Sequence, residues 1–239
     1  MDKISIIVPA LNEEGNVTPL VDDLVRILQE SRLDFEIVVV DDCSDDGTLE
    51  EIKNLQQTYS CVIPVQKDLP HGFGTTVRKG IQVASGRLGF VVSADNVDPI
   101  ETIPQMVQKL SNEGCALVLL SRRLRKGDDD YIPYKYKFFQ WGFRWLSIAL
   151  LGLPFKDITY SYRGFSLDII KRLSLESSSF EISPEITFKM WLHGYKIREI
   201  PGSPRVRTIG GSKFLFTKAG KGYPRVLLKA LRYRFTGKW

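Results

Sequence analysis

The most constraining feature of this sequence is a regular alternation between short β-branched segments and segments with helical apolar spacing. The first pair is the apolar run 4–9, which ends in proline, and residues 16–29, whose apolar residues recur every three or four positions. Further strands are expected at 35–40, 62–65, 88–92 and 116–120, and further helices at 48–59 and 72–84. Strands that alternate with helices form a mostly parallel sheet covered on both faces. We therefore predict an α/β fold with a Rossmann-like sheet flanked by helices, and 239 residues are enough to bury a substantial core.

Composition argues against a secreted, disulfide-stabilised or membrane-spanning protein. Cys43, Cys61 and Cys115 are far apart and lack the paired spacing of a zinc site, which predicts reduced and buried thiols. The first residues lead directly into a strand and show no signal-peptide pattern. The longest weakly charged run, 138–155, is interrupted by an arginine and a proline and is too short for a membrane span. We expect a cytoplasmic protein that is soluble or that lies at the cytoplasmic face of the membrane.

Carboxylates follow two of the expected strands at their carboxyl ends. Asp41 and Asp42 come after the second strand, and Asp95 and Asp98 come after the fourth. Open α/β sheets hold their ligands in a crevice at this edge. A carboxylate there can accept a hydrogen bond from a nucleobase ring N–H or from a ribose hydroxyl. The competing interpretation is that these carboxylates only cap the helices that follow them. After the second strand, Ser44 is another candidate cap for the next helix.

The glycine-containing segment 71–74 does not match a dinucleotide-binding loop, because a third glycine and a closely preceding strand are missing. We interpret Gly72 and Gly74 as residues that let the backbone turn tightly into the next helix. His71 and His193 have no partner motif and are interpreted as surface or packing residues.

Three segments resemble, in order and spacing, the inverting family-two glycosyltransferases, which have the GT-A fold. They are residues 5–14 (SIIVPALNEE), 39–48 (VVDDCSDDGT) and 93–95 (SAD), and the resemblance extends to about residue 215. It implies a donor site for a nucleoside-diphosphate sugar. The resemblance places Pro9, Leu11, Glu13 and Asp41 at the base and ribose, and Ser93, Ala94 and Asp95 at the diphosphate.

The sequence departs from the family pattern at the metal-binding motif. Family members usually carry Asp-x-Asp, and Ser93 replaces the first aspartate here. The resemblance implies Mg²⁺ or Mn²⁺ bound by Asp95, but one carboxylate holds a divalent cation more weakly than two. Ser93 would then reach the ribose or a metal-bound water, and Asp98 is a candidate substitute for the missing ligand.

The second half resembles polyprenyl-phosphate sugar transferases, in particular dolichyl-phosphate mannosyltransferase-like enzymes. Residues 120–122 resemble their Gly-Ser-Arg segment, while 157–163 and 207–213 resemble their Asp-x-Thr-x-x-x-Arg and Arg-x-x-Gly-x-Ser-Lys elements. The resemblance implies that the phosphate of the donor or acceptor is bound by Arg122, Arg163, Arg207, Ser212 and Lys213. The neighbouring Arg123 and Arg125 are instead expected to pair with nearby aspartates.

The resemblance predicts a single displacement that inverts the anomeric configuration, in which Asp95 and Arg207 stabilise the leaving diphosphate. A lipid phosphate is already anionic near neutral pH and needs no general base, whereas a sugar hydroxyl needs a carboxylate to accept its proton. Asp157 and Glu185 are the candidate bases, and Asp157 is alternatively a loop anchor.

The resemblance implies a hexosyltransferase-type glycosyltransferase, and the favoured acceptor is a polyprenyl phosphate of the dolichyl type. One alternative is transfer to a glycan hydroxyl in cell-envelope polysaccharide synthesis. Another is a nucleotide-sugar-binding protein without catalysis. Nucleic acid is not expected as a partner, because the basic residues near the carboxyl end form no known recognition module.

Two segments outside these motifs bear on membrane contact. The aromatic segment 134–151 is too apolar all round for an ordinary exposed helix. We expect part of it to pack in the core. The alternative for the rest is that it forms a lipid groove or lies at a bilayer surface. Residues 216–239 form a basic tail with an amphipathic helix expected at 220–236, which suits either an anionic membrane surface or packing on the domain. A peripheral contact with the membrane or with a membrane protein is therefore an option.

The predicted domain organisation follows from these segments. Residues 1–215 would form the GT-A domain, with a nucleotide-sugar half at 1–121 and an acceptor half at 122–215, and the tail at 216–239 would follow it.

Overall fold

A computed structural model describes residues 2–127, 132, 134–205, 207 and 222–239. Its strands are β1 (Ile4–Ala10), β2 (Phe35–Asp41), β3 (Val62–Gln66), β4 (Leu88–Val91), β5 (Leu117–Ser121), β6 (Arg163–Ser166) and β7 (Ile197–Pro201). Its helices are α1 (Val17–Glu30), α2 (Thr48–Thr58), α3 (Phe73–Val83), η1 (Ile100–Thr102), α4 (Ile103–Ser111), α5 (Tyr134–Leu151), α6 (Leu167–Arg172), α7 (Ile182–Leu192) and α9 (Gly222–Thr236). Each strand and helix predicted from periodicity is present, with its ends shifted by one or two residues at most positions.

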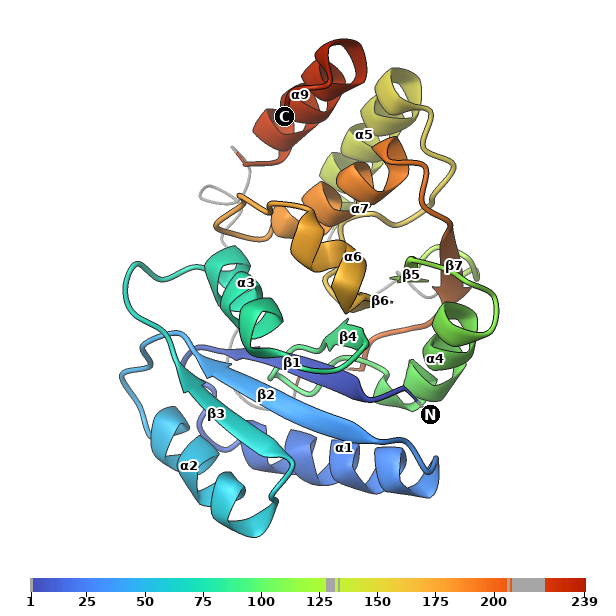
Figure 1. The fold of residues 1–239 in the computed structure, drawn as a ribbon. Helices are drawn as coiled ribbons and strands as arrows, with labels where there is room; N and C mark the ends of the chain where they lie inside the picture. The colour runs from blue at the N-terminus through green and yellow to red at the C-terminus, as the bar shows by residue number, and fades with distance from the viewer. Residues whose placement is uncertain (1, 128–131, 133, 206, 208–221) are drawn as a thin grey trace.

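The strands form one sheet in the order β3-β2-β1-β4-β6-β5-β7 (Figure 1). Only β6 among the described strands runs antiparallel to its neighbours, so the prediction of a mostly parallel sheet is confirmed. In the register, Ala10 of β1 lies opposite Asp41 of β2, and Ile7 lies opposite Val91 of β4. Strands β1, β2 and β4 therefore end at the same edge, and the loops that follow them lie side by side.

Strand β6 was not expected from the sequence. It is short and contains Gly164, so its pattern does not stand out as a strand. Its place is set by close packing between β4 and β5: a Cβ added to Gly164 would lie 2.5 Å from the Phe90 ring, and one added to Gly89 would lie 2.5 Å from the Phe165 ring.

Two hydrophobic clusters cover the two faces of the sheet. Alternate residues of β1 point to opposite faces: Ile4, Ile6 and Val8 join the cluster with α1, α2 and α4, whereas Ile7 joins the cluster with α3, α5, α6, α7 and α9. In Figure 1, α1 and α2 lie below the sheet and α3 lies above it. The predicted covering of both faces is confirmed.

Helices α5, α7 and α9 lie side by side at the top of the view in Figure 1. Tyr223 of α9 packs edge-on against Phe139 and Phe143 of α5, with ring centroids 5.5 Å and 5.2 Å apart. Arg234 donates to the carbonyl of Leu150 over 2.6 Å. The tail is thus helical over Gly222–Thr236 and packs on the domain through one face. The predicted boundary at residue 215 lies outside the described residues.

The predicted thiols are free, but the expectation that all are buried is wrong. Cys115 is buried, while Cys43 and Cys61 are half-buried because they lie in loops at the ends of strands on the β2 and β3 side of the sheet. Burial raises the pKa of the Cys61 and Cys115 thiols. Among the residues described, we find no helix with the length and apolar character needed to span a bilayer.

Candidate active site

The loops after β1, β2 and β4 each contain a residue in the left-handed backbone region. These are Asn12 (φ 49°), Cys43 (φ 57°) and Asn96 (φ 58°), none of which is glycine. Hydrogen bonds fix the loops to one another, since the Asn12 N–H donates to Ser44 Oγ over 2.9 Å and Asn96 Nδ2 donates to the carbonyl of Asn16 over 2.7 Å. Such conformations cost energy and cluster at functional sites, although asparagine also adopts them in ordinary turns. The carboxyl edge of β1, β2 and β4 is therefore a candidate site with a fixed backbone.

An ion-pair cluster lies at this edge and is completed by a distant part of the chain. The Arg205 N–H donates to the carbonyl of Val97 over 2.7 Å, which brings the segment after β7 to the loop after β4. Two residues further, the Arg207 guanidinium bonds Glu13 Oε2 over 2.7 Å and Asp95 Oδ2 over 3.1 Å. The structure thus brings Glu13 and Asp95, predicted for the donor site, together with Arg207, predicted to bind a phosphate and to stabilise the leaving diphosphate.

Asp95 is the incompletely satisfied member of this cluster. Burial raises the pKa of its carboxyl, and the neighbouring Arg207 opposes that effect. Its Oδ1 atom is buried without a hydrogen-bond partner among the described residues. A buried acceptor that lacks a partner is unusual in a folded protein and is explained when a cation, a donor or a water belongs beside it.

The residues present fit a divalent cation that is bound jointly with a ligand. No group of three metal-ligating side chains occurs in the described part of the chain. Mg²⁺ in particular often uses one or two carboxylates together with substrate phosphate oxygens. The unpartnered Oδ1 of Asp95 is an oxygen ligand of this kind.

Asp98 does not supply the second carboxylate. Its Oδ2 accepts the Ser93 N–H over 2.6 Å, and its Oδ1 accepts the Tyr160 hydroxyl. Burial raises the pKa of Asp98 to about 7. Because both oxygens are occupied inside the loop, the idea that Asp98 replaces the ligand missing at Ser93 is wrong in this arrangement. The alternative that Asp95 and Asp98 only cap the helix that follows them is also wrong, since η1 has no side-chain cap hydrogen bond.

Asp41 and Ser44 hold the loop after β2 together. Asp41 is fully buried, and both its oxygens lie 3.3 Å from the Ser44 N–H. The first turn of α2 is instead stabilised by Asp46, whose Oδ1 accepts the Thr48 N–H over 3.0 Å. The expectation that Asp42 or Ser44 caps α2 is therefore wrong, because Asp46 is closer to the helix start.

Asp42 fixes the loop between β3 and α3. It bonds Lys67 Nζ over 2.7 Å and accepts the Gly72 N–H over 2.8 Å. The interpretation of Gly72 and Gly74 as structural is supported, but for a different reason: a Cβ on Gly72 would lie 2.3 Å from the carbonyl oxygen of Ser178. Small residues are needed there because another loop approaches closely.

The other predicted donor residues lie along the same edge. Pro9 is half-buried near the end of β1 and Leu11 is half-buried directly after it, while Ser93 is half-buried and Ala94 is buried after β4. Their placement agrees with the predicted position beside a ligand, although their roles stay predictions.

Arg122, predicted to bind phosphate, is held by a buried carboxylate. Its Nε and Nη2 atoms bond Asp157 Oδ2 and Oδ1 over 2.6 Å and 3.0 Å, and its guanidinium carbon lies 4.4 Å from the centre of the Tyr160 ring. Although burial opposes ionisation, the attraction of Arg122 lowers the pKa of Asp157. Asp157 therefore anchors Arg122, as the loop-anchor alternative proposed, and has little tendency to accept a proton.

Arg163 is not brought to the edge. It is 1% exposed, and its guanidinium donates to the carbonyls of Ser161 over 3.1 Å and Ser183 over 2.5 Å and to that of Tyr160. Burial lowers its pKa to about 9. These contacts join β6 to α7 and leave the guanidinium inside the protein.

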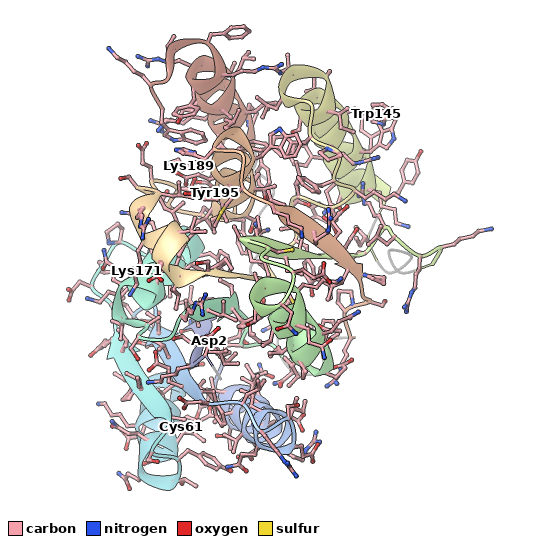
Figure 2. All side chains as sticks on the ribbon, turned by 45° about the vertical axis from the view of Figure 1, so that its right-hand side comes forward. Asp2, Cys61, Trp145, Lys171, Lys189 and Tyr195 are labelled. Carbon is pink, nitrogen blue, oxygen red and sulfur yellow. The ribbon has the colours of Figure 1, made fainter. Side chains whose placement is uncertain are left out.

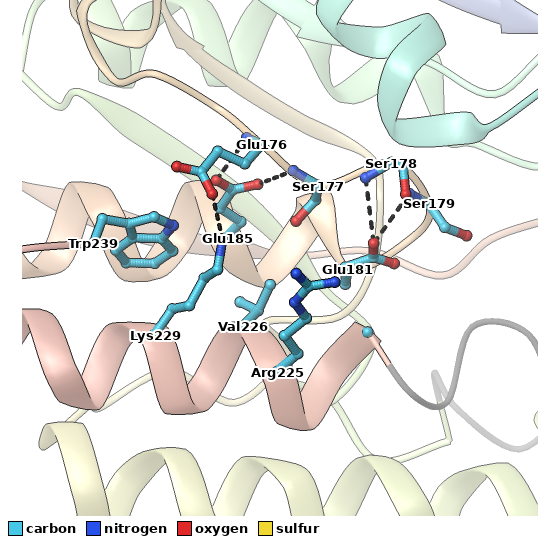
Figure 3. A pocket seen from close by; sticks show the side chains of 11 residues that line it. Glu176, Ser177, Ser178, Ser179, Glu181, Glu185, Arg225, Val226, Lys229 and Trp239 are labelled. Carbon is cyan, nitrogen blue, oxygen red and sulfur yellow. Dashed lines mark hydrogen bonds and ion pairs between the residues drawn. The ribbon is translucent and has the colours of Figure 1, made fainter. Parts of the chain in front are cut away.

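Both carboxylate oxygens of Glu185 are also bonded inside the protein (Figure 3). Glu185 is 0% exposed, its Oε1 and Oε2 accept the N–H groups of Glu176 and Ser177 over 2.9 Å and 2.8 Å, and Lys189 Nζ lies 2.9 Å from Oε1. Glu185 holds the loop before α7 in place. Ser212 and Lys213 lie outside the described residues.

Sequence reasoning missed Tyr160, which contacts both halves of the site. Its hydroxyl donates to Asp98 and its ring covers Arg122. Tyr160 stands at an unspecified position of the motif at 157–163, so only the fold reveals it. The sequence indicates the left-handed backbone at Asn12 and Asn96 only weakly: asparagine tolerates that conformation, and both residues follow a predicted strand.

Residues 5–174 match the family model described as glycosyl transferase family 2. A dolichol-phosphate mannosyltransferase of Pyrococcus furiosus is 30% identical over 215 residues, which cover 88% of this chain and 59% of the relative. A dolichol-phosphate mannosyltransferase of Mycosarcoma maydis is 28% identical over 240 residues, covering 97% of this chain and 80% of the relative. The chain therefore spans less than two thirds of the Pyrococcus protein's length.

Solved structures share the fold. Glucosyl-3-phosphoglycerate synthase from Mycobacterium tuberculosis, in complex with Mn²⁺, UDP and phosphoglyceric acid, superposes with a TM-score of 0.69 at 20% identity, covering 98% of this chain and 78% of that one. The same enzyme with Mg²⁺ and UDP gives a TM-score of 0.66 at 19% identity, covering 98% and 79%. The predicted GT-A fold is confirmed. The family match, which covers most of the chain, shows that this protein belongs to glycosyl transferase family 2.

Proposed function

We propose that this protein transfers a sugar from a nucleoside-diphosphate sugar to a polyprenyl phosphate with inversion at the anomeric carbon. The observation that carries the proposal is the cluster of Glu13, Asp95 and Arg207 at the carboxyl edge of the parallel sheet, with one oxygen of Asp95 unsatisfied. A diphosphate with its cation supplies both charges that this cluster accommodates, since phosphate oxygens pair with the guanidinium and the cation with the carboxylates.

The donor would lie over the loops after β1, β2 and β4. Pro9 and Leu11 would border the base, and Asp41 and Glu13 the base or ribose. Ser93 and Ala94 would lie at the diphosphate beside Asp95. The fixed, left-handed backbone at Asn12, Cys43 and Asn96 supports this placement, because it pre-forms the edge before a ligand arrives.

Asp95 would hold the divalent cation, Mg²⁺ or Mn²⁺, together with the donor diphosphate. A bound cation of this type would stabilise the negative charge of the leaving nucleoside diphosphate. Arg207 would move from the carboxylates to a phosphate oxygen as the donor and cation enter, since its present partners are the groups that the cation needs. Lys213 and Ser212 are proposed as further phosphate ligands.

The state of the candidate bases favours a phosphate acceptor over a hydroxyl. A hydroxyl acceptor needs a carboxylate that can take up a proton, whereas a phosphate attacks as an anion. Asp157 is ion-paired with Arg122, and Glu185 is bonded to two N–H groups and Lys189. We therefore propose that both act as positioning residues. The naming of two relatives as dolichol-phosphate mannosyltransferases supports the same acceptor class.

Arg122 is proposed as the acceptor-phosphate ligand, oriented by Asp157 and Tyr160. Arg163 is proposed to support this region from inside, because its donors already bond protein carbonyls. A lipid acceptor further implies contact with the cytoplasmic face of a membrane, either directly or through a membrane protein.

The test is a transfer assay with uridine and guanosine diphosphate sugars and three acceptors: a polyprenyl phosphate, the matching polyprenol and an oligosaccharide. We expect transfer to the polyprenyl phosphate alone, with an inverted anomeric centre by NMR. Transfer only to the polyprenol or to the oligosaccharide would overturn the acceptor assignment. Failure of every donor to bind or react would overturn the proposal as a whole.

A further inference from the structure

Strand β6 lies between β4 and β5 in the sheet and runs antiparallel to both (Figure 1). In the register, Arg163 at the start of β6 lies opposite Val91 at the end of β4 and opposite Leu119 of β5. The residues that precede Arg163 therefore lie at the carboxyl edge of the sheet, between the loop after β4 and the loop after β5. Tyr160 is one of these residues and is half-buried there.

The hydroxyl of Tyr160 is connected to the loop after β4 by two successive hydrogen bonds. It donates to Oδ1 of Asp98, which is 2% exposed, and Oδ2 of the same carboxyl accepts the Ser93 N–H over 2.6 Å. Ser93 directly precedes Ala94 and Asp95, which are proposed to lie at the diphosphate. Removing the hydroxyl takes away a donor from a buried carboxyl oxygen, which destabilises the arrangement around that oxygen. The position of the loop after β4 therefore depends on Tyr160.

The ring of Tyr160 covers a face of the Arg122 guanidinium. The guanidinium carbon lies 4.4 Å from the ring centre, while the Nε and Nη2 atoms bond the two oxygens of Asp157 over 2.6 Å and 3.0 Å. A bidentate pair fixes the direction in which the planar guanidinium points, and a ring against its face attracts the cation and restricts its tilt. Arg122, which is 7% exposed, is thus held from two directions.

We infer that Tyr160 is a positioning residue that holds the loop after β4 and the Arg122 guanidinium in a fixed relation to each other. In-line displacement needs the attacking oxygen and the anomeric carbon about 3–3.5 Å apart, and a misplacement of about 1 Å can cost about 100-fold in rate. The loop after β4 would place the donor through its diphosphate, and Arg122 would place the attacking phosphate. The inference rests on the proposed function, because it takes Arg122 as the acceptor-phosphate ligand.

A second tyrosine offers a matched control. Tyr162 is 0% exposed, and its hydroxyl also bonds the segment after β4, with Thr102 Oγ1 at 2.9 Å and the Pro99 carbonyl at 3.3 Å. Its ring centre lies 6.5 Å from that of Tyr160. Among the described residues, no hydrogen bond or ring contact joins Tyr162 to the carboxyl or the guanidinium that Tyr160 contacts. Tyr162→Phe therefore removes a hydroxyl of the same kind and leaves the proposed contacts in place.

The first test is steady-state transfer from a nucleoside-diphosphate sugar to a polyprenyl phosphate, with rates expressed per folded molecule. Tyr160→Phe keeps the ring and removes the hydroxyl, so we expect kcat to fall about tenfold while the KM for the acceptor stays the same. Tyr160→Leu also removes the ring and should in addition raise the acceptor KM about fivefold. Tyr162→Phe should match the unaltered protein in both constants.

The second test needs no acceptor and no turnover. Calorimetric titration of UDP and GDP in the presence of Mn²⁺ should show that the favoured nucleotide binds Tyr160→Phe about fivefold more weakly than Tyr162→Phe, because the Ser93 backbone has lost its support. Melting temperatures and circular dichroism check that each variant is folded. If Tyr160→Leu does not fold, the two phenylalanine variants decide the question.

Equal kcat and equal nucleotide affinity in Tyr160→Phe and Tyr162→Phe would overturn the inference, and a lower melting temperature alone would assign Tyr160 a purely structural role. A folded Tyr160→Leu variant with the acceptor KM of Tyr160→Phe would also overturn it, because the ring would then not position Arg122. If the unaltered protein binds nucleotide but transfers sugar to no acceptor, the proposed function fails by itself, and the titration decides whether Tyr160 supports the loop after β4.

Discussion

The candidate donor edge, formed by the carboxyl ends of β1, β2 and β4, and the candidate acceptor half, residues 122–215, are both rich in charge, but the residues predicted for their sites differ in how their charges are satisfied. At the donor edge, Asp95 keeps an unpartnered buried oxygen and a raised pKa. In the candidate acceptor half, both oxygens of Asp157 and of Glu185 and the guanidinium of Arg163 bond to other parts of the protein, and Glu181 is the residue there that keeps a buried oxygen without a partner among the described residues. Buried charges that are fully paired build structure, whereas an unsatisfied one indicates a ligand. The same residue types therefore have different uses in the two regions.

The largest effect on stability is expected from the acceptor half. Asp157→Ala leaves the buried Arg122 without its carboxylate and should lower the free energy of unfolding by about 3–5 kcal/mol. Urea denaturation measures this. The exposed pair of Glu101 and Arg205, 3.0 Å apart, is the control, and Glu101→Ala should cost less than about 1 kcal/mol. Equal losses in the two variants would show that the Arg122 pair is not a structural anchor.

At the donor edge we expect a loss of activity instead of stability. Asp95→Asn should lower the transfer rate by about 100- to 1,000-fold, because it removes a charge proposed to stabilise the leaving diphosphate. Its melting temperature should not fall, since burial already raises the pKa of Asp95 and so disfavours its charged form. If Asp95→Asn instead lowers the melting temperature and leaves the transfer rate per folded molecule unchanged, Asp95 has a structural role and the contrast between the two regions is wrong.

Asp98 lies between the two regions and should make stability depend on pH. Its pKa is raised to about 7 in the folded protein from an ordinary value of 3.8, so the folded state binds this proton more tightly than the unfolded state. The resulting stabilisation is present at low pH and is lost as the pH rises through about 7. Relative to Asp98→Asn, the unaltered protein should lose at most about 4 kcal/mol between pH 4 and pH 8. Urea denaturation at each pH measures the free energy of unfolding of both proteins. If the difference between the two stays constant from pH 4 to pH 8, the raised pKa of Asp98 is contradicted.

The smallest effect concerns the cation proposed for the candidate donor edge. Arg207→Gln removes a guanidinium that bonds Glu13 and Asp95, so Mn²⁺ should bind the nucleotide-free protein roughly fivefold more tightly, as expected from about 1 kcal/mol of charge interaction. Electron paramagnetic resonance of free Mn²⁺ measures this. Arg205→Gln, two residues away in an exposed pair, should leave the affinity unchanged. Weaker Mn²⁺ binding in Arg207→Gln would show that Arg207 does not compete with the cation.

The sheet and the position of Asp95 could be predicted from the sequence, because apolar periodicity locates strand ends and a parallel sheet gathers them at one edge. The contact of Arg207 with Glu13 and Asp95 spans 194 and 112 residues, and only the topology brings these groups together. Motif resemblance predicted Arg163 and Glu185 as site residues without revealing their burial, which depends on how β6 and α7 pack. Helix α5 shows the same limit, since composition predicted an apolar helix but did not show that the face with Phe138, Trp141 and Trp145 would stay exposed (Figure 2).

The central claim is that Asp95 at the donor edge receives a diphosphate together with a divalent cation. Calorimetric titration of UDP and GDP into the protein, with and without Mn²⁺, tests this most directly when it is repeated with Asp95→Asn. We expect one of the two nucleotides to bind the unaltered protein more tightly when Mn²⁺ is present, and this gain to disappear in Asp95→Asn. Binding that is equally tight in both proteins, or that does not respond to Mn²⁺, would contradict the claim.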